Sequence, residues 1–403
     1  MKAKSRFYLI SLFLFVLLLS SCTSTQSLRR GDWVEHGFSA EDRESLYSFV
    51  QEAVDNNEIP GMSVLLLHKG EVIFEEGFGY ADIENKVPFK ANAICRIASI
   101  SKPLMATVIV RLAQKGLLDI DKPIDFYLPE FKDIKLKNGQ KTSRAPTVRE
   151  LLSHTGGLDD ETPWNRKENQ QPGVTLEKMV KKYAAEGLVY EPGRYKLYSG
   201  MGIDTAARVA EVVTGKYRDE LLLEELARPL GLKTLTYCPE KKVVDSMPRV
   251  YRKSGDGFKL GSHYIDTMAP KPKSQYSSTG GGIVCSPQDL AVWLLMCRNI
   301  GVHQGKPFIS KAWMRQMFTR GPPGQIGIGF AVGEGSKAGY PRAVWHSGST
   351  GTYCWIDFEL DIFGITFLQS GRYFRSAVQD KFYEILGASL PKSNPKLGAY
   401  PKD

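Results

Sequence analysis

The sequence lacks the closely spaced ligand pairs that are typical of metal sites. Its 403 residues include six histidines and six cysteines, and no two cysteines have C-x-x-C spacing. Structural zinc sites usually use such pairs, so we expect no metal site. Most cysteines stand in apolar stretches, which indicates buried thiols, and a single disulfide among them stays open.

No long basic run is present either. The formal net charge is +9 at pH 7, but lysine and arginine are scattered and do not alternate with aromatic residues. Nucleic-acid-binding proteins concentrate basic residues on one face or segment, so we expect no nucleic-acid partner. The glycines at 280–282 are not followed by Lys-Ser or Lys-Thr. They therefore predict a tight turn near the edge of a site and not a phosphate-binding loop.

The longest uncharged apolar run lies near the N-terminus. Residues 7–19 follow Lys2, Lys4 and Arg6, and they are too few for a typical membrane span but match the apolar part of a signal peptide. The run ends in Leu-Ser-Ser-Cys, which resembles a bacterial lipobox, in which the cysteine is lipidated. A plain secretory signal is the alternative.

We therefore predict a lipoprotein-type signal peptide over residues 1–22, lipidation at Cys22 and a polar tether over 23–40. This pattern favours a bacterial lipoprotein outside the cytoplasm, at the outer membrane or facing the periplasm. The lipid would make the membrane one of its partners.

The remaining pattern alternates strand-like and helical segments. Amphipathic spacing predicts a helix over 41–58, and apolar runs flanking Lys69-Gly70 predict a hairpin over 62–82. Helix-capping and periodicity signals predict further helices from 99–101 to about 115, 175–187, 202–213, 286–299 and 373–387, and a capping box at Thr147 and Glu150 predicts another helix start. Two strands are expected at 352–360 and 365–370, around a turn at 361–364, and 159–173 reads as a surface loop.

This order predicts an α/β (α+β) fold with an antiparallel sheet flanked by helices. The C-terminal half would complete the sheet, and a mainly helical lobe would be inserted between the halves. We assign one domain to 41–390, with an α/β part at about 41–103 and 265–390 and a helical lobe at about 104–264. Residues 391–403 are a tail, and 239–278, the hardest to assign, could form a lid or an insertion.

The first candidate catalytic residues are Ser99 and Lys102, which have S-x-x-K spacing in the segment RIASISKPLMA. Pro103 fits only the first turn of a helix, so the helix begins at about 99–101. Free N–H groups there favour developing negative charge, and Lys102 lies on the same face as Ser99. A serine hydroxyl becomes a good nucleophile when a neighbouring base accepts its proton. The spacing alone also fits a capped helix with a solvated lysine.

Two further motifs follow in order: Tyr-Ser-Gly at 198–200 and His-Ser-Gly at 346–348. With the serine–lysine motif they resemble the penicillin-recognising serine hydrolases, namely class C β-lactamases, D-Ala-D-Ala carboxypeptidases and related esterases. The segments GFGYAD (77–82), LLSHTGGL (151–158) and GGGIVCSPQDLAVWL (280–294) match as well, and the resemblance spans about 42–390. RIASISK is also similar to the mitochondrial β-lactamase-like serine proteases of animals.

The resemblance implies a β-lactamase/transpeptidase-like fold and a role for each motif residue. Ser99 would be acylated, Lys102 would take or relay its proton, and Tyr198 would act as partner base and then as acid. His346, Ser347, Gly348 and Ser349 would bind substrate. The backbone N–H groups of Ser99 and Ser349 would form the oxyanion hole. No metal or other cofactor is implied.

Two positions depart from the family pattern. Gly200 replaces the asparagine that usually ends the second motif, and that asparagine commonly contacts the lysine and the substrate amide. His346 replaces the lysine of Lys-Thr-Gly and supplies positive charge less constantly at neutral pH. Efficient β-lactam hydrolysis is thus less favoured, and recognition of a free carboxylate is less assured.

Three interpretations of function stay open. The first is a serine hydrolase that forms an acyl-enzyme on amide or ester bonds, with a β-lactam, a D-amino-acid peptide of cell-wall type or a small ester as substrate. The second is a penicillin-binding-type receptor that is acylated without efficient turnover. The third is a non-catalytic scaffold. His154 is expected to hold a loop through hydrogen bonds. Ser101 is expected to cap its helix, with a proton-relay hydroxyl as the alternative.

Overall fold

The computed structural model of the chain describes residues 28–159, 169, 171, 173–261, 275–321, 326–333, 335, 340–371, 374 and 376–388. The predicted signal peptide with Cys22 and the tail 391–403 lie outside the described residues, as does most of the predicted surface loop. Within the described part, no helix has the length and apolar character that crossing a bilayer requires.

A seven-stranded antiparallel sheet forms the centre of the fold. Its strand order is β10-β11-β12-β13-β1-β2-β3. Strand β1 pairs with β2 on one side and with β13 on the other, so the C-terminal half completes the sheet, as predicted. The strands are β1 (Gly61–His68), β2 (Glu71–Asp82), β3 (Val87–Pro88), β10 (Ala331–Val332), β11 (Ala343–Ser347), β12 (Tyr353–Asp357) and β13 (Ile362–Leu368).

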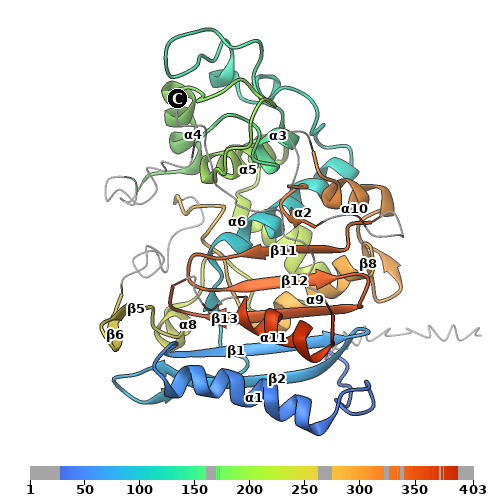
Figure 1. Cartoon of the computed structure of the whole chain (residues 1–403). Helices are drawn as coiled ribbons and strands as arrows, with labels where there is room; N and C mark the ends of the chain where they lie inside the picture. The colour runs from blue at the N-terminus through green and yellow to red at the C-terminus, as the bar shows by residue number, and fades with distance from the viewer. Residues whose placement is uncertain are drawn as a thin grey trace, which may run out of the picture.

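Helices cover both faces of the sheet because both faces of its central strand are apolar. All of β1 is buried, and alternate residues of a strand point to opposite faces. Val64 and Leu66 join the apolar cluster of α1 (Ala40–Asp55) and α11 (Ala377–Ile385). Leu65 and Leu67 join the cluster of α2 (Ser101–Gln114) and α9 (Pro287–Arg298). Figure 1 shows α1 and α11 across the near face of the sheet.

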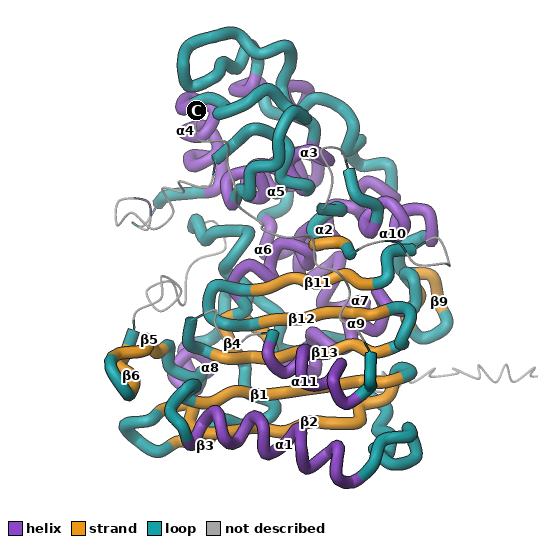
Figure 2. The backbone as a smooth tube through the Cα atoms, viewed as in Figure 1, coloured by secondary structure: helices purple, strands orange, loops and turns teal. Residues whose placement is uncertain are grey.

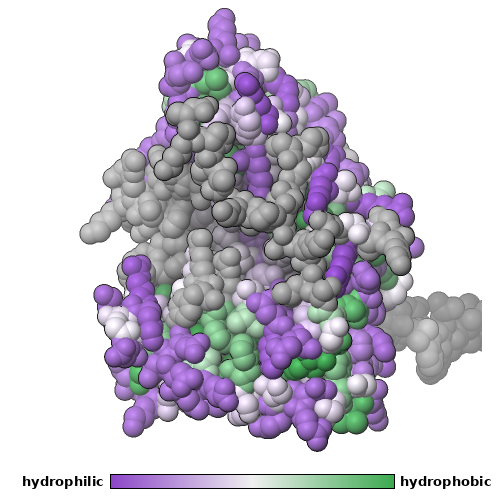
Figure 3. Space-filling model, in the orientation of Figure 1, coloured by the Kyte–Doolittle hydropathy of each residue, from purple (hydrophilic) through white to green (hydrophobic). Residues whose placement is uncertain are grey.

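A helical lobe stands beyond β11, the last long strand at one edge of the sheet (Figure 2). Helices α3 (Val148–Leu152), α4 (Leu176–Glu186) and α5 (Gly200–Thr214) meet in it, and α5 also contacts α2. Helix α2 therefore connects the lobe with the sheet. The described surface of this lobe is mainly hydrophilic in Figure 3, whereas apolar side chains gather over the half that holds the sheet.

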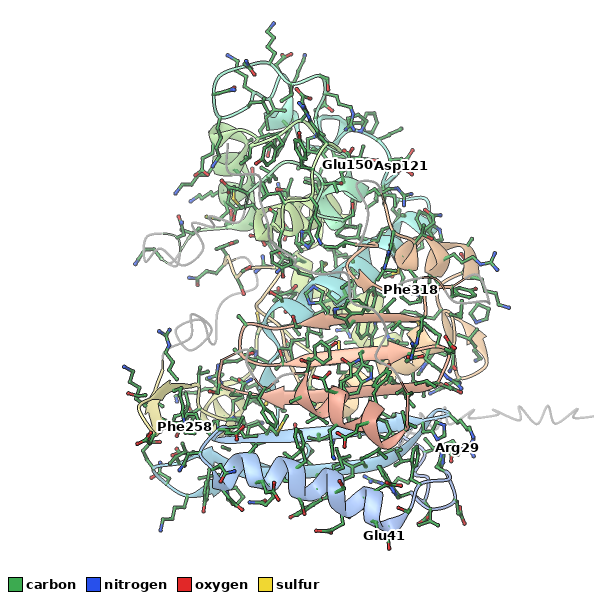
Figure 4. The ribbon with its side chains drawn as sticks, viewed as in Figure 1. Arg29, Glu41, Asp121, Glu150, Phe258 and Phe318 are labelled. Atoms are coloured by element: carbon green, nitrogen blue, oxygen red, sulfur yellow. The ribbon has the colours of Figure 1, made fainter. Side chains whose placement is uncertain are left out.

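Capping side chains set the helix starts as the sequence predicted. Thr147 and Glu150 form a reciprocal capping box at α3, and Thr175 and Ser286 accept backbone N–H hydrogen bonds at the starts of α4 and α9. Figure 4 shows Glu150 and Asp121 in the helical lobe. Arg149 joins Asp121 to Gln316 of α10 (Lys311–Phe318), which fastens the lobe to the rest of the chain.

The remaining elements are short. They are β4 (Cys95–Arg96), β5 (Tyr251–Ser254), β6 (Gly257–Leu260), β7 (Val284–Cys285), β8 (Val302–His303), β9 (Lys306–Pro307), α6 (Arg218–Leu222), α7 (Arg228–Leu230) and α8 (Lys241–Ser246), with 3-10 turns at Ala98–Ile100, Ile124–Phe126 and Pro129–Phe131 and a π-helical turn at Leu223–Ala227.

The predicted tether at 23–40 is wrong for its described part. Trp33 and Phe38 are buried against Phe74 and Phe382, and the Gly31 N–H donates to a β2 carbonyl. The prediction rested on the polar composition of 23–31, whereas these two aromatic side chains follow that stretch, and their burial keeps the segment on the sheet.

Three further boundaries differ from the prediction. Helix α11 is shorter than 373–387, and β13 already begins at Ile362, so the turn lies at 358–361. The β5–β6 hairpin falls inside the predicted helical lobe but binds the sheet side, where Tyr251 N–H donates to the Gln369 carbonyl. The predicted helical lobe over 104–264 therefore includes a hairpin that packs with the sheet part of the molecule.

Candidate active site

Ser99 lies in a tight turn between a short strand and a helix. Strand β4 pairs with β7 and leads into the 3-10 turn Ala98–Ile100, after which α2 begins. Ala98 has a φ of 47°, a left-handed backbone that is costly for a residue other than glycine. From Cys95 to Val110 every residue is buried except Ser99, which is half-buried. The turn thus leaves Ser99 as the accessible residue of a buried segment.

Lys102 lies in the first turn of α2 and is 4% exposed. Its Nζ donates hydrogen bonds to Ser99 Oγ at 3.0 Å and to the Gly280 carbonyl at 2.9 Å. Both acceptors are uncharged oxygens. The S-x-x-K spacing therefore brings the amine into direct contact with the hydroxyl.

Tyr198 stands directly before the cap residue of α5, and Lys102 Nζ lies 4.7 Å from the centroid of its ring. Ser199 caps the helix: its Oγ accepts from the Gly202 N–H at 2.8 Å and donates to the Asp159 carbonyl at 2.7 Å. The N-terminal ends of α2 and α5 therefore meet around the lysine.

His154 contacts all three residues from 197 to 199. Its carbonyl accepts from the Leu197 N–H at 2.7 Å, and its Nδ1 accepts from the Ser199 N–H at 3.1 Å. Its ring lies 4.5 Å from the Tyr198 ring, centroid to centroid. The prediction that His154 holds a loop by hydrogen bonds is confirmed. Burial lowers the pKa of His154 well below its ordinary value, and the charge of Lys102 acts in the same direction.

The third motif lies at the end of β11, beside the Ser99 turn. Thr350 and Thr352 donate hydrogen bonds to the carbonyls of Arg96 and Ile97 at 2.8 and 3.0 Å. Gly348 is so close that a Cβ there would lie 2.5 Å from the Ile97 carbonyl oxygen. These contacts bring the strand end against the chain that leads to Ser99.

The side chains of this third motif differ in exposure. His346 is buried and its Nδ1 lies 3.0 Å from the Ser347 carbonyl, while Ser349 is exposed in the turn that follows. His346 also lies near enough to His154 to lower its pKa. The three motifs, far apart in sequence, therefore surround one location.

A buried polar network holds the carbonyl that receives Lys102. The carboxylate of Asp204, on α5, accepts from the Thr279 N–H at 2.7 Å, directly before Gly280. Its other oxygen accepts from the hydroxyls of Tyr276 and Tyr183 at 2.7 and 3.0 Å. Burial raises the pKa of Asp204, and its hydrogen bonds act in the opposite direction. Helix α5 is thus connected to two residues that contact Lys102: Tyr198, just before its N-terminus, and Gly280, through the Thr279 N–H that Asp204 binds.

Sequence reasoning missed Asp204 and the Gly280 carbonyl as parts of the site. The signal for Asp204 is a lone carboxylate within the apolar stretch that begins α5. The glycines at 280–282 were assigned to a turn near the site, but a carbonyl acceptor leaves no mark in a sequence. The predicted capping role of Ser101 is wrong, because its Oγ accepts from the Ile283 N–H at 3.1 Å.

The described residues include no cluster of three or more histidine, cysteine or carboxylate side chains placed to hold a metal ion. Among the described residues, Cys95, Cys238, Cys285, Cys297 and Cys354 form no disulfide, and burial raises the pKa of Cys354 to about 12. None of these thiols takes part in the contacts around Ser99 that are described above.

A helix-flanked antiparallel sheet with this serine–lysine pair at its edge is the arrangement of the serine β-lactamases and penicillin-binding proteins. The chain belongs to the Beta-lactamase family, whose sequence profile matches residues 46–388. The fold class and family resemblance inferred from the sequence are thereby confirmed.

Individual relatives are distant. The chain is 25% identical over 279 residues to PbpX of Bacillus subtilis, covering 69% of this chain and 63% of that protein. It is 37% identical over 138 residues to the mitochondrial serine beta-lactamase-like protein LACTB of Mus musculus, covering 34% of this chain and 24% of that one. The chain thus spans less than two thirds of either relative.

Among solved structures, EstCE1, a hydrolase with promiscuous acyltransferase activity, has the same fold. Its TM-score is 0.73 at 24% identity, over 86% of this chain and 100% of EstCE1.

Proposed function

We propose that the chain is a serine hydrolase that forms an acyl-enzyme at Ser99 and acts on ester or amide bonds. The observation that carries this proposal is the 3.0 Å hydrogen bond between Lys102 Nζ and Ser99 Oγ. A lysine in that position accepts the hydroxyl proton when it is neutral, and it thereby activates the oxygen. Membership in the Beta-lactamase family and the fold shared with EstCE1 support this kind of chemistry.

Acylation follows from the contacts around Lys102. Ser99 Oγ forms a bond to the substrate carbonyl carbon while its proton passes to Lys102 Nζ. The bond to the leaving group then breaks, and Tyr198 gives its phenol proton to that group. Lys102 returns a proton to the Tyr198 oxygen. Water then attacks the acyl carbon, loses a proton to the same pair, and releases Ser99 with its hydroxyl restored.

Charge on the substrate oxygen needs hydrogen-bond donors during both steps. We propose the backbone N–H groups of Ser99 and Ser349 for this role. The contacts of Gly348, Thr350 and Thr352 with the Ser99 turn support it, because they hold the end of β11 beside the nucleophile. Removal of one such donor typically slows catalysis about 10²–10³-fold.

Gly200 favours esters over amides as substrates. The usual asparagine would contact both the lysine and the substrate amide, whereas Gly200 has no side chain. The Gly280 carbonyl already gives Lys102 a second acceptor, so the lysine is held without the asparagine. Nothing at position 200 can hydrogen-bond a substrate amide through a side chain. We therefore propose a small or activated acyl ester as the preferred substrate class.

A second candidate is a receptor that is acylated without efficient turnover, and Gly200 favours it as well. Loss of the asparagine would leave the acyl-enzyme without a contact that orders it for attack by water. The two candidates share Ser99 as the acylated residue and differ in the fate of the acyl group.

One experiment separates them. The purified chain and its Ser99→Ala variant are each given a short-chain p-nitrophenyl ester and a chromogenic cephalosporin. We expect continuous ester hydrolysis, slow or absent cephalosporin hydrolysis, and neither activity in Ser99→Ala at an unchanged melting temperature. A single stoichiometric burst would favour the receptor, and hydrolysis that survives in Ser99→Ala would refute both.

A further inference from the structure

His154 is constrained more tightly than a loop residue usually is. Its φ is 60°, in the left-handed region that a histidine adopts at an energetic cost. It is 2% exposed, and its backbone carbonyl and its Nδ1 both accept hydrogen bonds from the chain around Tyr198. A strained, buried residue that persists beside a reactive site suggests that the strain serves that site.

The contacts of His154 converge on Tyr198. One hydrogen bond holds the N–H of Leu197 and another holds the N–H of Ser199, the residues on either side of this tyrosine, while the imidazole ring packs on the tyrosine ring at 4.5 Å. The tyrosine ring in turn lies 4.7 Å from Lys102 Nζ. We propose that His154 is a positioning residue that holds the Tyr198 ring against Lys102, an inference that rests on the proposed function.

Histidine suits this role for a chemical reason. Nδ1 accepts from the Ser199 N–H, so in the neutral ring the proton is on Nε2. An asparagine would keep an acceptor near Nδ1 but would remove the ring from Tyr198. A phenylalanine would keep a ring but would leave a buried N–H without an acceptor. Only a neutral imidazole supplies both contacts.

Neutrality is maintained by the surroundings. Burial is the largest cause that lowers the pKa of His154, and Lys102, His346 and Lys196 each add to it. All three neighbours carry positive charge when protonated, so a charged His154 would be repelled from every one of these side chains. The imidazole therefore packs beside Tyr198 without placing a positive charge next to Lys102.

The test compares His154→Asn and His154→Gly, both of which tolerate a positive φ. Asparagine removes the ring, and glycine removes the ring and the acceptor. We measure the rate constant for acylation of Ser99 by a p-nitrophenyl ester across pH, with His303→Asn as a control on β8. We expect losses of about 10-fold for asparagine and about 100-fold for glycine, in kcat and not in KM, and no change for the control.

A double-mutant cycle distinguishes positioning from general stability. Tyr198→Phe removes the oxygen through which His154 would act. If His154 positions that oxygen, His154→Asn slows the wild-type chain about 10-fold but has almost no further effect on Tyr198→Phe. Equal effects in both backgrounds would overturn the inference. If the wild-type chain is not acylated at Ser99 at all, it is the proposed function that fails.

A spectroscopic measurement needs no active variant. The chain has six histidines, so ¹⁵N chemical shifts of the imidazole nitrogens can be assigned with His154→Asn as reference. We expect His154 to stay neutral, with its proton on Nε2, well below pH 6.5. Protonation near pH 6.5, or a proton on Nδ1, would contradict the hydrogen bond on which the inference depends.

Discussion

At the residue scale, Lys102 is the side chain on which the site depends most. It has two oxygen acceptors, Ser99 Oγ and the Gly280 carbonyl, and a tyrosine ring beside it. These contacts come from three separate segments, so the amine is held in one position. A buried lysine with such fixed contacts is better explained by a role in proton transfer than by a role in keeping the protein soluble.

Replacing this lysine should therefore abolish most activity without unfolding the chain. For Lys102→Met we expect a decrease of about 10²–10⁴-fold in the rate of Ser99 acylation, because the proton acceptor is lost while the aliphatic stem remains. Lys115→Met, at the other end of α2, is the matched control and should retain full activity. Stopped-flow ester kinetics measure both. Equal rates in the two variants would argue against a proton-accepting lysine.

Gly280 is the second residue whose identity matters. A Cβ at this position would lie 3.0 Å from Lys102 Nζ and 3.2 Å from its Cε. For Gly280→Ala we expect displacement of the lysine and a decrease of about 10-fold or more in kcat/KM, since small misplacements of reacting groups slow catalysis strongly. Gly257→Ala on β6 is the control, because its Cβ meets no atom within 4 Å. Unchanged ester hydrolysis in Gly280→Ala would show that the lysine has room to adjust.

At the element scale, α5 connects stability with the site. Its cap residue Ser199 follows Tyr198 directly, and Asp204 on the same helix holds the Thr279 peptide. Helix α4 also begins at a side-chain cap, Thr175, which has the same capping chemistry.

The two caps allow a matched comparison. Ser199→Ala and Thr175→Ala should each lower the free energy of unfolding by about 1 kcal/mol, because each leaves a helix N–H without its side-chain acceptor. Only Ser199→Ala should also slow ester hydrolysis, since its loss loosens the chain at Tyr198. Urea unfolding gives the stability and steady-state kinetics gives the rate. A parallel loss of activity in both variants would assign the effect to stability alone.

At the scale of the whole molecule, buried histidines make stability depend on pH. Burial is the largest cause that lowers the pKa values of His154, His68 and His303 from their ordinary value of 6.5. Below pH 6.5 the unfolded chain therefore binds protons that the folded chain does not. The free energy of unfolding must then fall as pH decreases, by at most about 1.4 kcal/mol per pH unit for each such group.

Because the free energy of unfolding falls as pH decreases, the His154→Asn variant should differ from the wild-type chain at acidic pH. Between pH 6.5 and 5 the variant should lose stability less steeply than the wild-type chain, because one histidine with a lowered pKa is gone. Above pH 7 the two slopes should agree. Urea unfolding at pH 7.5, 6.5 and 5.5 measures the difference. Identical slopes over the acidic interval would mean that His154 titrates normally in the folded chain.

Local signals predicted most of the elements and the order of the motifs. The capping residues Thr147, Thr175 and Ser286 marked helix starts because each acts on N–H groups within three residues of itself. The apolar runs on either side of Lys69-Gly70 predicted the hairpin of β1 and β2 for the same reason. Segments held by distant contacts are predicted poorly: the sequence indicates a polar tether over 23–40, whereas Trp33 and Phe38 are buried against the sheet part.

By itself, the sequence determined the fold class, the helix starts and the serine–lysine pair, all of which depend on neighbours along the chain. Only the tertiary structure decided what surrounds that pair. The His154 ring, the Asp204 carboxylate and the Gly280 carbonyl reach the site from segments that lie about 50 to 180 residues after Lys102 in the chain. A backbone carbonyl, moreover, has no residue type that would reveal it in a sequence. The environment of a reactive group is set by packing between distant segments, which spacing along the sequence does not record.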